Sequence, residues 1–137
     1  MNEAAGAVTF VWLGMVLAIS FLEAPLKFRA PGVTIQVGLG IGRLVFRALN
    51  VVECVLATVV VVVVAAGDAP GRAVAWTVAV AALLLGQLAV IRPRLNRRSD
   101  RVLAGEDLPR SRGHLFYIAF EAAKAVALIG LGATLLA

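Results

Sequence analysis

Ionisable and amide side chains recur at helical spacing in two otherwise apolar stretches of this sequence. Successive members of each group are three or four positions apart, which places them on one face of an α-helix. The first group is Arg43, Arg47, Asn50 and Cys54, with Glu53 at its edge, and the second is His114, Tyr117, Glu121 and Lys124. Acids, bases and amides gathered in this way form buried ion pairs or bind a small polar molecule.

Long uncharged runs surround these groups and indicate the elements that position them. The chain has 137 residues, of which 61% are hydrophobic, and its mean hydropathy is +0.96. A membrane-spanning helix needs about 20 mostly apolar residues, because each residue rises about 1.5 Å. The sequence therefore predicts an all-α membrane protein, a four-transmembrane-helix bundle in a single domain over residues 1–137. The predicted helices cover about 4–22, 42–67, 72–91 and 114–137.

The connections between these helices are read from proline and glycine. Pro25 and Pro31 are expected to end the first helix, because proline has no backbone N–H to donate. Residues 33–42 are rich in glycine, and their secondary structure is ambiguous. Residues 67–71 are expected to form a tight turn, and residues 92–113 a loop. We expect the first helix to be retained, because no basic segment precedes it and no cleavage site follows it.

Basic residues are distributed unevenly and predict the orientation. Eleven of the 13 Lys and Arg residues flank the first connection or fill the third, whereas only Arg72 flanks the second. Because positive loops stay in the cytoplasm, both termini are expected outside, and the chain is expected in the cell's inner (plasma) membrane. The basic residues lie at helix ends, so we expect membrane lipids as partners and no nucleic acid.

Counting from the helix ends places the polar side chains in the cytoplasmic half of the membrane. At 1.5 Å per residue, Glu53 and Lys124 both lie ~9–10 Å inside the boundary, and Gln87 and Glu121 lie ~6 Å inside. Matching depth predicts an ion pair between Glu53 and Lys124, and Arg47 is the expected partner of Glu121. The predicted ligand-binding residues are Arg43, Arg47, Asn50, Glu53, Gln87, His114, Tyr117, Glu121 and Lys124.

Two interpretations of these residues remain open. They form either an ion-paired cluster that only fixes the register of the helices, or a polar pocket that is closed outward and open to the cytoplasm or the inner leaflet. Ionisable residues inside the membrane favour the pocket. No catalytic residue is assigned. A single histidine argues against a metal site, and no cofactor is expected. Trp12 and Trp76 are interpreted as interfacial or packing aromatics.

Several segments resemble a widespread group of small bacterial four-helix membrane proteins. The similar segments are Ser20-Phe-Leu-Glu-Ala-Pro-Leu-Lys-Phe28, Gly42-Arg-Leu-Val-Phe-Arg-Ala-Leu-Asn-Val-Val-Glu53, Arg92-Pro-Arg-Leu95 and the spaced residues His114, Tyr117, Glu121 and Lys124. This resemblance covers nearly the whole chain and implies an architecture without a particular activity.

A second resemblance, limited to the second helix, is to the MAPEG family of membrane glutathione transferases. Those proteins are trimers of four-helix subunits whose second helix holds glutathione with an Arg-x-x-x-Asn-x-x-Glu motif. Asn50 and Glu53 match this motif, while Phe46 stands at the arginine position and Arg47 follows it. The resemblance implies a thiol cosubstrate held by Arg47, Asn50 and Glu53.

Together these observations predict a homo-oligomeric membrane protein that binds or transports a small polar or amphipathic molecule. A MAPEG-like transferase and an accessory subunit of a larger membrane complex are the alternatives.

Overall fold

The computed structural model describes residues 1–106 and 112–137, and the side chains of all of these except 112–114. The described chain is helical without strands, and four helices are long and apolar enough to cross a membrane. The elements are α1 (Asn2–Val16), η1 (Leu17–Glu23), α2 (Ala24–Lys27), α3 (Ile35–Ala66), α4 (Gly71–Gly86), η2 (Gln87–Ile91), α5 (Arg92–Leu103) and α6 (Arg112–Leu136). The predicted all-α bundle of four spans is confirmed.

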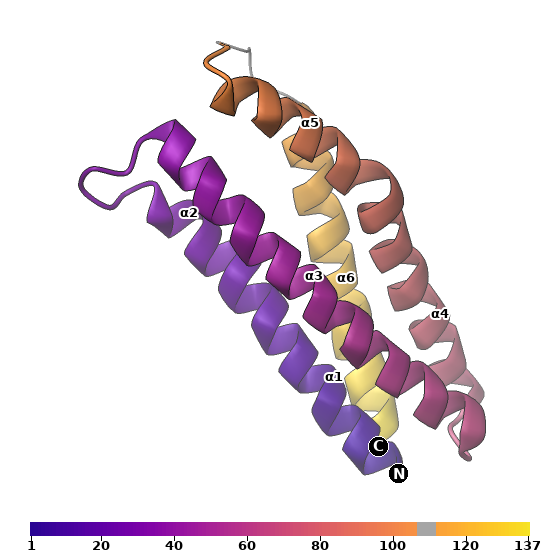
Figure 1. Cartoon of the computed structure of the whole chain (residues 1–137). Coiled ribbons are helices and arrows are strands. Elements are labelled where there is room, and N and C mark those ends of the chain that lie inside the picture. The colour runs from indigo at the N-terminus through magenta and orange to yellow at the C-terminus, as the bar shows by residue number, and fades with distance from the viewer. Residues whose placement is uncertain (107–111) are drawn as a thin grey trace.

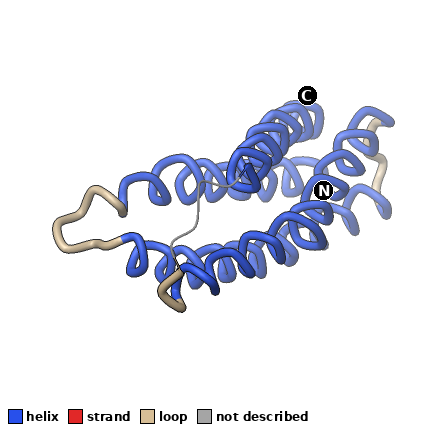
Figure 2. The backbone as a smooth tube through the Cα atoms, turned by 90° about the horizontal axis from the view of Figure 1, so that it is seen from above, coloured by secondary structure: helices blue, strands red, loops and turns tan. Residues whose placement is uncertain are grey.

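The four spans are arranged so that α6 and α1 lie side by side at the centre of the packing (Figure 1). The first span also packs on α3, and α4 packs on the other side of α6, while α3 and α4 meet less extensively. Both termini and the turn between α3 and α4 lie at one end, and the connection from α2 to α3 lies with α5 at the other (Figures 1 and 2). The molecule therefore has a basic end and an end that carries both termini.

Apolar side chains cover both the interior and the outside of the bundle. Leu128 and Leu131 are fully buried in the core, whereas Val51, Val62 and Leu85 point outward with more than half of their surface exposed. Exposed aliphatic side chains along all four spans suit contact with lipid tails, which is the pattern of a multi-pass membrane protein.

The first and third spans both continue beyond their predicted ends, and each passes a proline. The first reaches Lys27 rather than residue 22, and the third reaches Leu103 rather than residue 91, so most of the predicted loop after 91 is helix. Each span contains a π-helical turn that ends two residues before a proline, Pro25 or Pro93. In these turns the N–H groups of Ala24 and Arg92 donate to the carbonyl groups five residues earlier. The wider turn makes room for the proline ring, which would break a regular α-helix.

The second span begins earlier than predicted and resolves the ambiguous segment. It starts at Ile35 rather than near residue 42, because the Thr34 side chain accepts a hydrogen bond of 3.1 Å from the N–H of Val37 and caps the helix. Gly38 and Gly42 lie against the side chains of Phe28 and Lys27, where any larger residue would collide. The glycines therefore permit the close approach of α3 to α2.

Labelling of engineered cysteines tests the predicted orientation of these two ends. In a Cys54→Ala background, an impermeant maleimide added outside the cell should modify Ala69→Cys, in the turn between α3 and α4, and spare Ala104→Cys, which follows α5. Both variants should react after solubilisation in detergent. The opposite pattern in intact cells would reverse the assignment of the basic end to the cytoplasm.

Candidate functional site

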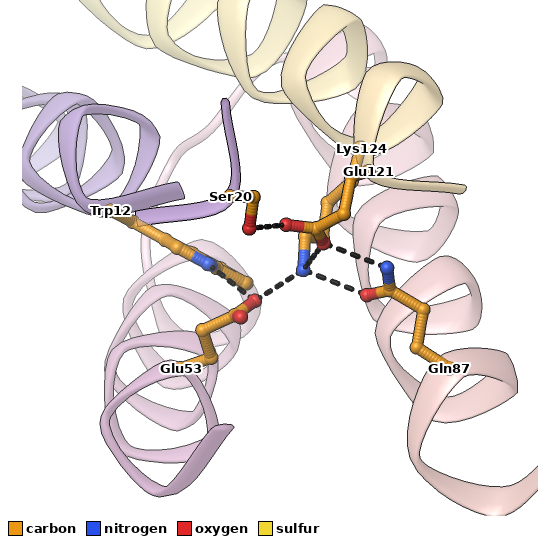
Figure 3. A network of polar contacts seen from close by, with 6 residues as sticks. All are labelled: Trp12, Ser20, Glu53, Gln87, Glu121 and Lys124. Carbon is orange, nitrogen blue, oxygen red and sulfur yellow. Dashed lines mark hydrogen bonds and ion pairs between the residues drawn. The ribbon is translucent and has the colours of Figure 1, made fainter. Parts of the chain in front are cut away.

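Lys124 on α6 is the centre of a buried polar network that contacts every span (Figure 3). Its side chain is fully buried, and its Nζ lies 2.6 Å from Glu53 Oε2, 2.6 Å from Glu121 Oε1 and 2.7 Å from Gln87 Oε1. Three acceptors therefore match the three N–H donors of the ammonium group. The predicted pair of Glu53 and Lys124 is confirmed.

The first span completes the network with two side chains. Trp12 on α1 donates its indole N–H to Glu53 Oε2 at 3.0 Å, and the hydroxyl of Ser20 on η1 donates to Glu121 Oε2. The amide of Gln87 on η2 also donates to Glu121 Oε1 at 2.7 Å. One ammonium group, two carboxylates and three neutral partners thus join all four spans.

The predicted partner of Glu121 was wrong. Glu121 pairs with Lys124, three residues later on the same helix, whereas Arg47 is exposed on the outer surface of α3. Arg47 and Glu53 are six residues apart on α3 and therefore face different sides of the helix, so the face that brings Glu53 to the network directs Arg47 away from Glu121. Trp12 and Ser20 were missed as members of the network. A buried tryptophan usually finds an acceptor for its N–H, and that was the available signal.

The network is closed in this structure. Glu53, Gln87, Glu121 and Lys124 each expose no more than 3% of their surface. The mutual attraction of these charges offsets the large cost of removing them from water only while their partners are in place. In this arrangement the network clamps the helices together and leaves no opening for a ligand between its members.

A groove of about 740 Å³ lies beside the network, between α3 and the η2–α5 part of the third span. It is lined by Arg43, Leu44, Arg47, Asn50, Val51, Cys54, Val55, Leu88, Arg92 and Asn96. Three guanidinium groups and two amides thus share the groove with aliphatic side chains, and no carboxylate is among its lining residues. Outside the lining, Asp100 on α5 forms an ion pair with Arg43.

Arg92 forms part of the groove wall and was not among the predicted site residues. Its Cζ lies 4.8 Å from the ring centroid of Phe46 and 4.6 Å from that of Tyr117. These two rings meet edge to face, with centroids 5.5 Å apart, so the guanidinium group is held by cation–π contacts with both. The sequence analysis placed Arg92 at the start of a loop because the uncharged run of the third helix ends at residue 91, whereas the helix continues to Leu103.

The nine predicted ligand-binding residues therefore separate into distinct places. Arg43, Arg47 and Asn50 line the groove, whereas Glu53, Gln87, Glu121 and Lys124 form the network. Tyr117 is buried beside Arg92, and the side chain of His114 lies outside the described residues. Among those residues, no group of histidines, cysteines and carboxylates is arranged to hold a metal ion.

The groove and the network share the same helical turns. On α3, Asn50 faces the groove, and Glu53, three residues later, faces the network. On η2, Leu88 faces the groove and its neighbour Gln87 faces the network. The Asn50 and Glu53 pair of the MAPEG-like motif consequently does not converge on one cavity.

No family model, curated protein or solved structure matches the chain. Function is therefore inferred from the groove and the network themselves.

The network predicts a definite order of stabilities. Lys124→Met leaves two carboxylates buried without a cation, so it should reduce the free energy of unfolding by about 3–5 kcal/mol. Glu53→Leu should cost less, because Lys124 keeps Glu121 and Gln87. The double variant Glu53→Leu/Lys124→Met should recover part of the loss, since Ser20 and Gln87 still donate to Glu121.

Unfolding of the purified variants in detergent measures this order, with Arg97→Met, at an exposed position of the basic end, as a control for loss of a cation. A Lys124→Met variant as stable as the parent would contradict the buried ion pairs.

Proposed function

We propose that this chain binds a small amphipathic molecule in the groove between α3 and η2–α5, as a step in its transport or its presentation to a partner. The observation that carries this proposal is the divided lining of the groove. Arg43, Arg47, Asn50, Arg92 and Asn96 supply polar contacts, while Leu44, Val51, Val55 and Leu88 supply an apolar wall. A ligand with a polar head and an apolar tail satisfies both parts at once.

The size and position of the groove support such a ligand. A volume of about 740 Å³ lies within the usual range of small-molecule sites, about 300–1,000 Å³. Val51 and Val55 are also exposed on the outside of α3, so the apolar wall continues onto the surface that faces lipid tails. A molecule dissolved in the membrane can therefore enter sideways, between α3 and the third span.

The buried network supports the groove from behind. Because α3 and η2 contribute residues to both, the ion pairs of Lys124 hold the two walls of the groove at a fixed separation. The network in this proposal is a support and the groove is the binding site, which combines the two interpretations left open by the sequence.

The cellular setting of the proposal follows from charge and exposed surface. The basic end, with the groove, faces the cytoplasm in this proposal, and the resemblance to small bacterial membrane proteins favours the inner (plasma) membrane of a bacterium. Four spans alone enclose little volume, and exposed aliphatic side chains on α6, such as Val126 and Ile129, offer a surface on which copies of the chain can pack as a homo-oligomer.

Obstruction of the groove tests this function. Val55→Trp should fill the apolar wall and weaken binding of a spin-labelled stearate by about tenfold, a loss of about 1.4 kcal/mol. Val62→Trp is the matched control, because Val62 lies two turns further along α3, is 58% exposed against 59% for Val55, and does not line the groove.

Electron paramagnetic resonance of the protein in lipid nanodiscs measures the immobilised fraction of the label. Equal immobilisation by the parent and both variants would exclude binding of amphipathic molecules in the groove.

A further inference from the structure

We infer that the head group bound in the groove is a phosphate, received by Arg92 together with Arg47 and carried on an apolar chain. This inference rests on the proposed function, since it names the ligand class of the same groove.

The charge of the groove lining calls for an anion. Its three guanidinium groups face no carboxylate among the ten lining residues, and Asp100 pairs with Arg43 alone. In the part of the chain that the structure describes, Arg47 and Arg92 form no ion pair. Two positive charges therefore remain uncompensated at one site, and they match the charge of a phosphate ester.

Arg92 presents a pair of donors that suits an anion. Its Nε and Nη2 atoms are both buried and neither has a hydrogen-bond partner among the described residues. These two nitrogens form one edge of the guanidinium plane, the edge that donates two parallel hydrogen bonds to a pair of oxygens on one anion. Buried donors without acceptors are unfavourable, so this edge gains most from a ligand that supplies both oxygens.

The surroundings of Arg92 prepare it for this role. Phe46 and Tyr117 hold the guanidinium plane, and the hydroxyl of Tyr117 is itself buried without a partner in the described chain. Arg92 is also one of the residues that line the groove. A rotation of its side chain toward the ligand exchanges part of its ring contacts for hydrogen bonds to an anion, and it breaks no ion pair within the described structure.

Phosphate fits this arrangement better than a carboxylate because it has more oxygens. A carboxylate has two, and the edge of Arg92 takes both. A phosphate ester offers a further oxygen that can reach Arg47 or Asn50 across the groove while Arg92 keeps its two. The aliphatic wall of Val51, Val55 and Leu88 beside the cationic part indicates a phosphate attached to an apolar chain, as in a lipid, rather than a free ion.

Binding of matched amphiphiles to the intact chain tests the inference. Native mass spectrometry from dodecyl maltoside compares dodecyl phosphate, dodecanoate and inorganic phosphate at equal concentrations. The parent should bind dodecyl phosphate about tenfold more tightly than dodecanoate, and should bind inorganic phosphate more weakly than either.

Variants of Arg92 distinguish the contribution of its paired N–H donors from that of its positive charge. Arg92→Gln and Arg92→Lys should both lose the preference for phosphate, because lysine keeps the charge but lacks the paired donors. Arg94→Gln is the control, since Arg94 is exposed on the same helix, does not line the groove, and should retain the preference.

The outcomes distinguish this inference from the proposed function. Binding of dodecyl phosphate and dodecanoate with equal affinity, weakened by Val55→Trp, would overturn the phosphate assignment and leave the groove as a binding site. Inorganic phosphate bound as tightly as dodecyl phosphate would overturn the inference that the phosphate is carried on an apolar chain. Binding that no groove variant changes would overturn both proposals.

Discussion

A buried ammonium group constrains the whole bundle. Lys124 lies among apolar helices with no exposed surface, and such a charge is stable only where acceptors surround it. Glu53 on α3, Gln87 on η2 and Glu121 on α6 supply those acceptors, and Trp12 and Ser20 tie the first span to the carboxylates. Only one relative depth of the four spans brings these groups together, so the network sets the register of the bundle.

The position of the groove follows from the same constraint. Because α3 and η2 direct some residues toward Lys124, the residues beside them, Asn50 and Leu88, face outward into the space between the two spans. The third span remains helical past Pro93, which carries Arg92 to the groove wall against Phe46 and Tyr117. The buried network and the cationic groove are thus formed by different faces of the same helices.

The depth of the polar residues could be predicted from the sequence, whereas the directions of several side chains could not, for a physical reason. Depth along a helix depends only on the rise per residue, so counting correctly paired Glu53 with Lys124. The direction of a side chain depends on an unbroken period of 3.6 residues, and the two π-helical turns interrupt that period at Ser20 and Gln87. The same turns let the helices pass Pro25 and Pro93, which is why two helix ends and the role of Arg92 were not predicted.

The central claim is that the groove holds an amphipathic molecule in the cell. Photocrosslinking tests it most directly, with a photoreactive amino acid placed at Leu88, which lines the groove, or at Leu85, which is exposed to lipid one turn earlier. After irradiation of cells, mass spectrometry should find a discrete amphipathic adduct at position 88 that is absent at position 85. The same mixture of bulk lipid adducts at both positions would contradict the account.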